Sequence, residues 1–326
     1  MKYLKLILGH LISFFFIYLF VDKLDIEKLE DFNHSINWEY FCLAIFINVI
    51  SYFIHALRWN RFFIDQKVSF SNLIKTILMG HMFNTILPSK AGELIRPLFF
   101  HRISKIKYID ILSTCFIERV FDGLLVLLLL FVSIIYFGTN DLVITGTYFT
   151  MSLYFGCITF CIISYLLKNK IIHLLDKNIS PLKCKLKDAF LDFISGIGRI
   201  KNISNLAWIS FYTVIYWFLN ILALWSILYT INLPVQIQSP YTAMFIAGSM
   251  GVALSLPSAP ANIGVYHYAI YLIFTIIVEK SNLLVDANLF IIAAVLIHLG
   301  AIIPDLILGA VSYYTFPKAM KDNLPK

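Results

Sequence analysis

The sequence predicts an all-α polytopic membrane protein made of a single transmembrane domain, and three observations support this prediction. Of its 326 residues, 60% are hydrophobic and 14% are charged, whereas roughly 25% of the residues in a soluble domain are charged. Several apolar runs are as long as the roughly 20 helical residues that cross a bilayer. Lys and Arg gather in short loops between these runs, where they set orientation. The net charge of +7 therefore does not indicate a nucleic-acid partner.

Six uninterrupted apolar runs predict full spans by their length and continuity. They cover residues 4–21, 39–57, 111–137, 148–167, 206–230 and 287–315. The first run follows Lys2 and Lys5 as a signal peptide would, but it ends without a cleavage site of small residues. We therefore expect it to remain as the first span.

Two further apolar stretches, residues 70–103 and 241–278, are each interrupted by Pro, Gly and Ser. The interruptions read LPSKAG at 87–92 and LPSAPANIG at 256–264, and an α-helix cannot continue through either. Each stretch is expected to form a broken re-entrant hairpin. Short full spans at these places, which would give eight spans, are the alternative.

The charges of the loops predict the topology, because cytoplasmic loops are enriched in Lys and Arg. The segments 58–75, 90–107 and 168–203 are basic, whereas 22–37 is acidic and 231–240 is uncharged. The two hairpins would then enter from opposite faces, with both termini in the cytoplasm of a bacterial or archaeal plasma (inner) membrane. Within the basic loop, apolar residues at helical spacing predict an interfacial helix.

The two breaks share the string Leu-Pro-Ser, at 87–89 and 256–258. Hairpins of opposite orientation with a common break predict an inverted repeat. In transporters such paired breaks mark the binding site. Two unrelated kinked hairpins are the alternative.

Charged residues within a span are costly, so each one is a functional candidate. Glu118, Arg119 and Asp122 lie in the run 111–137. Glu118 and Asp122 share a helix face, and Arg119 can pair with Asp122 at a spacing of three. These residues predict either a structural salt bridge or a site that faces the hairpins and binds an anionic headgroup or a proton.

The first break carries a second group of candidates, namely Asn84, Pro88, Gly92, Glu93 and Arg96. The helix that starts after the break would offer free amides to a phosphate. The guanidinium of Arg96 matches phosphate oxygens with two parallel hydrogen bonds. Pairing of Glu93 with Arg96 at the cytoplasmic surface is the alternative.

The second break offers Pro257, Asn262, Gly264 and His267. A single histidine near a helix start can titrate near neutral pH, but it is more often a packed hydrogen-bonding residue. On the last span, His298 and Asp305 suggest a polar stripe, and structural pairing is its expected meaning.

His55 and Arg58 stand at the cytoplasmic end of the second span. We expect them to anchor that end by extending towards water. The five cysteines are odd in number and lie mostly in apolar runs, which argues against disulfides. No catalytic, nucleotide-binding or metal-binding motif occurs, so neither a cofactor nor a metal is expected.

The motifs Asn84-x-x-Leu87-Pro88-x-x-x-Gly92-Glu93-x-x-Arg96 and Glu118-Arg119-x-x-Asp122 resemble the lysylphosphatidylglycerol synthase transmembrane (flippase-like) family. The resemblance extends over nearly the whole chain and includes the second break. It implies a freestanding translocase, or flippase, for a lipid or lipid-linked sugar. The residues that it marks for substrate binding are Asn84, Pro88, Gly92, Glu93, Arg96, Glu118, Arg119, Asp122, Pro257, Asn262, Gly264 and His267.

Two features depart from that family. Fused members carry a soluble aminoacyl-transferase domain after the membrane region, and we expect none after Lys326, so lysyl transfer is not expected. Where the second hairpin of the family usually reads Pro-Gly-x-x-Gly-x-x-Glu, this sequence has His267 in place of the acid. A carboxylate role at that position is therefore in doubt.

The expected partners are membrane lipids and a lipid or lipid-linked sugar substrate with an anionic headgroup. An intramembrane enzyme that uses Glu118 and Asp122 as acid and base is a competing interpretation. A non-transporting partner of a lipid or glycan synthase is a third, and a homo-oligomer is left open.

Overall fold

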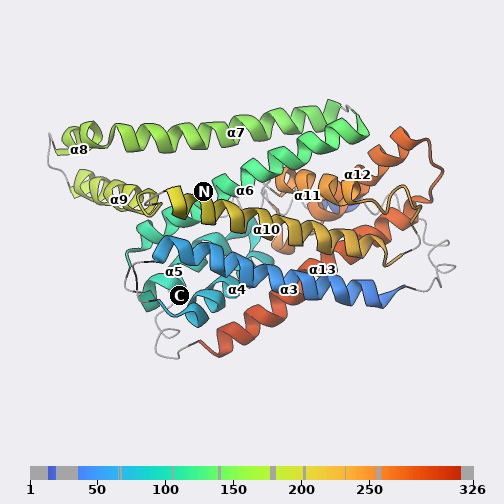
Figure 1. Cartoon of the computed structure of the whole chain (residues 1–326), viewed down its shortest axis with the longest axis horizontal. Coiled ribbons are helices and arrows are strands. Elements are labelled where there is room, and N and C mark those ends of the chain that lie inside the picture. Colours follow the sequence, from blue (N-terminus) through green and yellow to red (C-terminus); the bar gives the residue numbers. More distant parts are fainter. Residues whose placement is uncertain are drawn as a thin grey trace.

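The structure of the protein, a computed structural model, describes residues 14–19, 36–64, 66, 68–104, 106–138, 141–176, 181–200, 203–231, 233–254 and 258–316. Every regular element among these residues is a helix. Five long helices run from one end of the molecule towards the other (Figure 1). They are α3 (Trp38–Asn60), α6 (Tyr108–Phe137), α7 (Asp141–Leu166), α10 (Ile203–Leu228) and α13 (Ala287–Tyr314).

Six segments of the described chain are long and apolar enough to cross a membrane. They are Trp38–Phe63, Tyr108–Phe137, Val143–Leu166, Ile203–Leu228, Pro260–Ser281 and Ala287–Tyr314. Five of them match predicted spans, which confirms the all-α polytopic class. The predicted first span, residues 4–21, lies outside the described residues except for 14–19, which are helical. The remaining segment, Pro260–Ser281, belongs to the second predicted hairpin.

Both predicted hairpins are broken at the expected places. The first consists of α4 (Phe70–Ile86) and α5 (Gly92–Ser104), joined by the 3-10 turn Pro88–Lys90. The second consists of α11 (Pro240–Ala253) and α12 (Val265–Ser281), with the 3-10 turn Pro260–Asn262 between them.

The backbone at the two breaks explains why the helices stop. Leu87 is extended, with φ −102° and ψ 146°, as the residue before a proline prefers. In the second break Ala261 and Asn262 have φ of 55° and 54°, and Gly264 reaches 86°. A right-handed helix cannot pass through such values.

The hairpins approach each other from opposite ends of the molecule. In Figure 1, α4 and α5 lie towards one end, and α11 and α12 lie towards the other. The turns Pro88–Lys90 and Pro260–Asn262 contact each other. Their continuous helical arms have 13 to 17 residues, at or below the roughly 17 residues of the shortest spanning helices. One arm, α12, reaches a spanning length of 22 residues when its 3-10 turn is included. Short arms whose turns meet are the arrangement expected of re-entrant hairpins.

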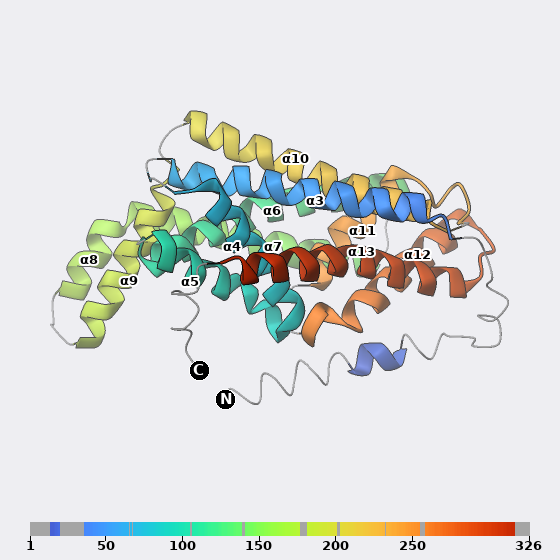
Figure 2. The same ribbon diagram turned by 90° about the horizontal axis from the view of Figure 1, so that it is seen from below.

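The helix predicted within the basic loop is present as α9 (Pro181–Ile197), which follows α8 (Lys168–Asp176). Both lie at the same end as α5 (Figure 2). Just beyond α9, Arg199 Nε donates to Asp110 Oδ1 of α6 at 2.7 Å. Lys107 Nζ donates to Asp192 Oδ1 at 2.7 Å, and this bond holds the pKa of Lys107 above its usual value. Helix α9 is thereby tied to the start of α6.

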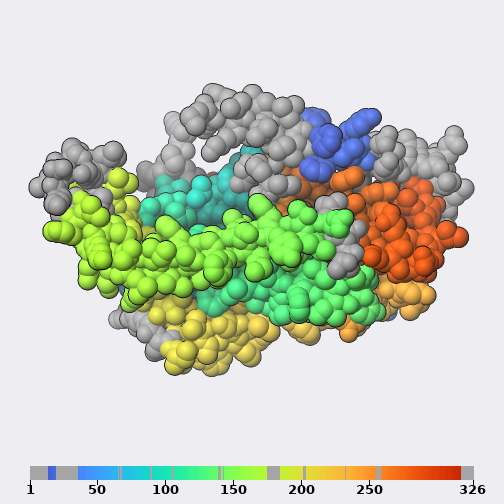
Figure 3. All heavy atoms as spheres, turned by 90° about the horizontal axis from the view of Figure 1, so that it is seen from above, coloured from blue at the N-terminus to red at the C-terminus, as the bar shows by residue number. Residues whose placement is uncertain are grey.

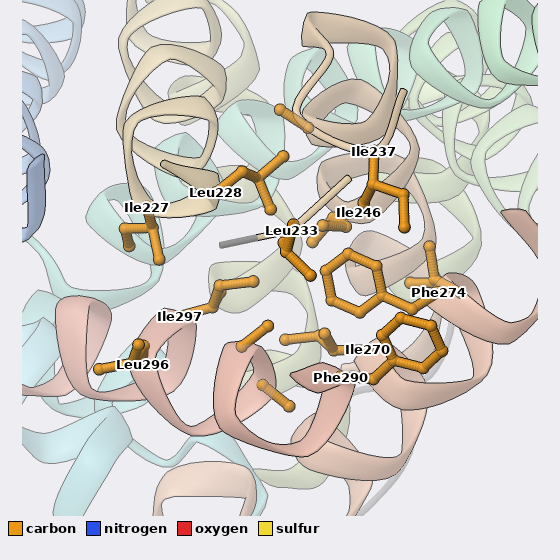
Figure 4. Packing of buried hydrophobic residues seen from close by; sticks show 14 of the residues in the cluster. Ile227, Leu228, Leu233, Ile237, Ile246, Ile270, Phe274, Phe290, Leu296 and Ile297 are labelled. Carbon is orange, nitrogen blue, oxygen red and sulfur yellow. The ribbon is translucent and has the colours of Figure 1, made fainter. Parts of the chain in front are cut away.

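A large apolar core occupies the opposite end of the molecule, where α10 to α13 meet. Its labelled members in Figure 4 come from α10, the following loop, α11, α12 and α13. The rings of Phe274 and Phe290 stack there at 5.3 Å between centroids. This packing holds the second hairpin against α13.

Helix α7 faces outwards along most of its length. Figure 3 shows it lying along the outside of the molecule, across the face turned to the viewer. Phe155 and Leu166 expose 69% and 72% of their surface. In water such a surface would be unfavourable, whereas in a bilayer it meets lipid chains.

Candidate functional site

Three arginines and three carboxylates meet between α3, the first hairpin and α6. This ion cluster consists of Arg58, Glu93, Arg96, Glu118, Arg119 and Asp122. At its centre Glu118, whose side chain is fully buried, accepts a bond from Arg58 Nε at 3.2 Å and one from Arg96 Nη2 at 2.5 Å. The charges of the six side chains cancel, which is the condition for burying them in a membrane.

Arg58 lies inside the protein, so the expectation that it extends towards water is wrong. Its side chain is fully buried, and its Nη1 donates to Asp122 Oδ1 at 2.6 Å. Its guanidinium also lies over the ring of Tyr216 at 5.2 Å. Arg58 turns inwards because the two carboxylates of α6 stand opposite it. Asp122 receives a further bond from Trp217 Nε1 at 3.1 Å.

Arg96 is also buried and does not pair with Glu93 at the surface. Its guanidinium lies 4.5 Å from the centroid of the Trp59 ring, and Nη1 lies 3.0 Å from Nε2 of His55. His55, expected to anchor the end of α3, is likewise buried within the site. The cluster therefore faces the first hairpin, as one of the sequence interpretations expected.

Asn84 and Gly92 hold the first hairpin closed. Asn84 Oδ1 accepts from the amide of Glu93 at 3.1 Å, and Asn84 Nδ2 donates to Glu93 Oε1 at 3.3 Å. A Cβ on Gly92 would lie only 2.6 Å from the backbone nitrogen of Asn84, so only glycine permits this approach of α4 and α5.

The amides at the start of α5 are already engaged. The Glu93 amide donates to Asn84, and those of Leu94 and Ile95 donate to the Ala91 carbonyl at 3.0 and 3.2 Å. The expectation that these amides are free for a phosphate is therefore not met. The cationic donors near the first break are the guanidinium groups of Arg96 and Arg119 and the ammonium group of Lys90.

Arg119 has the loosest contacts of the three arginines. Its side chain is 45% exposed, and it lies 3.6 Å from Glu93 Oε1 and 3.6 Å from Asp122 Oδ2. The second contact confirms the predicted pairing with Asp122. A small crevice of about 10 Å³, room for about one water, lies beside it and is lined by the polar side chains of His55, His81, Asn84, Glu93, Arg96 and Arg119.

A second polar group lies next to this crevice around Asp305 of α13. Tyr52 Oη donates to Asp305 Oδ1 at 2.5 Å, and Thr85 Oγ1 donates to Oδ2 at 3.3 Å. His81 Nδ1 lies 3.7 Å from Oδ1. The structural pairing expected of Asp305 and His298 is confirmed, but with different partners, because His298 contacts His267 of the second hairpin. Sequence reasoning missed His81 and Tyr52, which no motif marks.

The candidates of the second break form a network of their own. Ser258 Oγ donates to Asn262 Oδ1 at 2.7 Å, and the amide of Gly264 donates to His267 Nδ1 at 3.4 Å. His267 Nε2 lies 3.1 Å from His298 Nδ1. These contacts fix the start of α12 against α13. Pro257 lies outside the described residues.

The Pro88 turn of the first hairpin abuts the turn that contains Asn262, and this second turn also contacts α4. The two groups of predicted residues are thus neighbours in space. The ion cluster takes its members from α3, α5 and α6 only. The second break contributes no charged side chain to the cluster and packs beside the first hairpin.

Comparisons with known proteins agree with this architecture. The model of the family described as lysylphosphatidylglycerol synthase TM region matches residues 6–309. A UPF0104 membrane protein of Methanocaldococcus jannaschii is 25% identical over 273 residues, which cover 76% of this chain and 79% of that protein. No solved structure matches. The family match covers most of the chain, including both hairpins and four of the five long helices in full and α13 up to residue 309, and the chain accordingly belongs to the family of the lysylphosphatidylglycerol synthase transmembrane region.

Proposed function

We propose that the protein is a flippase, which moves a lipid, or a lipid-linked glycan or isoprenoid, with an anionic headgroup between leaflets. One observation carries the proposal. A charge-balanced cluster of three arginines and three carboxylates lies between a re-entrant hairpin and α6, and a crevice opens beside its most exposed member, Arg119.

Arg119 is the residue that first meets the headgroup. Its two contacts of 3.6 Å are longer than the roughly 2.7–2.9 Å of a good charge-assisted hydrogen bond. A phosphate can therefore replace a carboxylate as its partner at little loss. Arg96 is held more tightly, by Glu118 at 2.5 Å, and it becomes available only when that bond opens.

An apolar groove bordered by α6, α7, α11 and α12 fits the hydrocarbon chain of the same lipid. It has a volume of about 380 Å³, within the roughly 300–1,000 Å³ of ligand pockets. Apolar side chains of α6, α7, α11 and α12 line it, among them Leu130, Val143, Ala253 and Leu272. Phe16 closes one side, and its ring lies 5.5 Å from that of Tyr268. Ala253 and Val265 border the second break.

The orientation that we propose follows from the charges. Lys107, Lys168 and Arg199 stand at the end of the molecule that carries α5, α8 and α9 (Figure 2). This end would face the cytoplasm of a plasma membrane. The first hairpin then enters from the cytoplasm and the second from outside.

The competing enzyme interpretation is less favoured by the geometry. A general acid or base must touch its substrate. The side chain of Glu118 is fully buried behind Arg58 and Arg96, and that of Asp122 is only 7% exposed and bonded to Arg58 and Trp217. Carboxylates screened from a substrate in this way suit a charge-balanced binding site better than acid-base catalysis.

The test is lipid exchange in proteoliposomes. Fluorescent phosphatidylglycerol and polyprenyl phosphate are followed by the accessibility of their labels to a quencher that cannot cross the membrane. A hydrogen bond to a charged group is worth roughly 1.5–3 kcal/mol, so Arg119→Ala should slow exchange about tenfold to a hundredfold. Arg102→Ala, six residues beyond Arg96 along α5, is the matched control. Wild-type rates in Arg119→Ala, or no exchange of any anionic probe by the wild type, would refute the proposal.

A further inference from the structure

A chain of titratable side chains links α13 to the centre of the ion cluster. Nδ1 of His81 lies 3.7 Å from Asp305 Oδ1, and its Nε2 lies 3.4 Å from Nδ1 of His55. Nε2 of His55 in turn lies 3.2 Å from Glu118 Oε1. We call these four residues the relay. Each imidazole thus turns one nitrogen towards the member before it and the other towards the member after it. The four residues lie on four different helices.

We propose that this relay carries a proton between Asp305 and Glu118, and that the protein couples the movement of its anionic lipid to that proton. The inference rests on the proposed function and adds its energy source. Neither histidine was marked as a binding residue by any motif in the sequence.

The positions of the atoms allow a balanced transfer. In the starting state Asp305 carries a proton, both histidines carry theirs on Nε2, and Glu118 is ionised. Asp305 gives its proton to His81 Nδ1, His81 gives its Nε2 proton to His55 Nδ1, and His55 gives its Nε2 proton to Glu118. One proton has moved, and both histidines have changed tautomer without remaining charged. His55 Nε2 can then accept from Arg96 Nη1, which lies 3.0 Å away.

The Asp305 end of the relay is accessible to solvent, and the Glu118 end is buried. The side chains of His81 and Asp305 are 22% and 18% exposed, whereas those of His55 and Glu118 are 1% and 0% exposed. The 3.7 Å step at Asp305 exceeds a hydrogen bond, and a water at this accessible place can bridge it. In the proposed cycle a proton enters at Asp305, is held on Glu118 while the headgroup is bound, and leaves Glu118 on the opposite side when the headgroup is released.

Groups from every neighbouring element surround the relay. Those that face it are Tyr52 and Arg58 on α3, Glu93 and Arg96 on α5, Cys115, Arg119 and Asp122 on α6, Tyr216 on α10 and Tyr266 on α12. Tautomer exchange passes a proton without adding a positive charge next to these three arginines.

Arrival of the proton changes the charge of the cluster. Protonated Glu118 no longer holds Arg96 as an ion pair, and three arginines then face only two carboxylates, Glu93 and Asp122. The cluster has gained one positive charge, which an anionic headgroup can neutralise. A proton and a headgroup of one negative charge are therefore bound together.

The experiment uses full-length protein in liposomes with fluorescent phosphatidylglycerol and a pH-sensitive dye in the lumen. The lumen is set one pH unit above the outside, and the steady-state ratio of the probe between the leaflets is measured. With one proton per lipid, wild type should hold about a tenfold excess in the inner leaflet, because one pH unit corresponds to a factor of ten. The lumen should acidify as the probe enters.

The test variant is Asp305→Asn, which keeps a hydrogen-bonding group for Tyr52 but cannot take up or release a proton. The matched control is Asp286→Asn, at the start of the same helix, where the side chain caps the Asn288 amide and an asparagine caps equally well. We expect a ratio near one in Asp305→Asn and about ten in Asp286→Asn. His81→Gln replaces Asp305→Asn if that variant does not fold.

Two results would overturn the relay while leaving the flippase intact. One is wild-type exchange whose steady-state ratio stays near one with the gradient applied. The other is a tenfold ratio in Asp305→Asn or in His81→Gln. Absence of any wild-type exchange would instead reject the proposed function itself, and the relay with it.

Discussion

Replacing Arg58 by alanine should destabilise the protein far more than replacing Arg119. Arg58 is fully buried and bonded to Glu118 and Asp122, so its removal leaves a buried net charge of −1. Breaking a buried ion pair in this way costs about 3–5 kcal/mol. Arg119 is 45% exposed with contacts of 3.6 Å, and exposed pairs contribute at most about 1 kcal/mol.

The assay is the thermal midpoint of the purified protein in detergent, followed by size-exclusion chromatography after heating. At about 2–4 °C per kcal/mol for a large domain, Arg58→Ala should lower the midpoint by about 6–20 °C and Arg119→Ala by no more than about 4 °C. The double variant Arg58→Ala with Asp122→Asn restores charge balance and should recover part of the loss. The reasoning is refuted if Arg58→Ala melts within 2 °C of wild type, or if both single variants fall equally.

Further predictions concern packing in the first hairpin and the attachment of α9. Gly92→Ala forces a Cβ against the Asn84 amide and should cost about 1–3 kcal/mol, while Gly156→Ala, with nothing within 4 Å, should be neutral or stabilising. Equal midpoints for the two variants would contradict the tight contact of α4 with α5. Asp110→Asn removes the ion pair with Arg199, so limited proteolysis should cut near α9 sooner than in wild type; unchanged cleavage would show that this pair does not hold α9.

Local sequence features sufficed to predict the architecture. Uninterrupted apolar runs predicted the long helices, and the clusters at 87–92 and 256–264 predicted both breaks, because proline and glycine act on the backbone within a few residues. Pairing of Arg119 with Asp122 was predictable for the same reason, since residues three apart share a helix face.

Contacts between helices could not be predicted in this way. Arg58 and Glu118 are 60 residues apart in the sequence. The periodicity within each helix does not reveal that α3 and α6 bring these two side chains together. His298 and Asp305 are two turns apart, about 10 Å along the axis, which is too far for direct contact. Each therefore meets a different neighbour, His267 in one case and Tyr52 in the other.

The central claim is that an anionic headgroup binds at the ion cluster, and the exchange of two fluorescent lipids tests it most directly. Phosphatidylglycerol, which is anionic, and phosphatidylcholine, which is zwitterionic, are compared in the same proteoliposomes with wild type and with Arg119→Ala. The account predicts rapid exchange of phosphatidylglycerol by the wild type, little exchange of phosphatidylcholine, and loss of the difference in Arg119→Ala. Equal exchange of both lipids by the wild type, or an undiminished preference in Arg119→Ala, would contradict it.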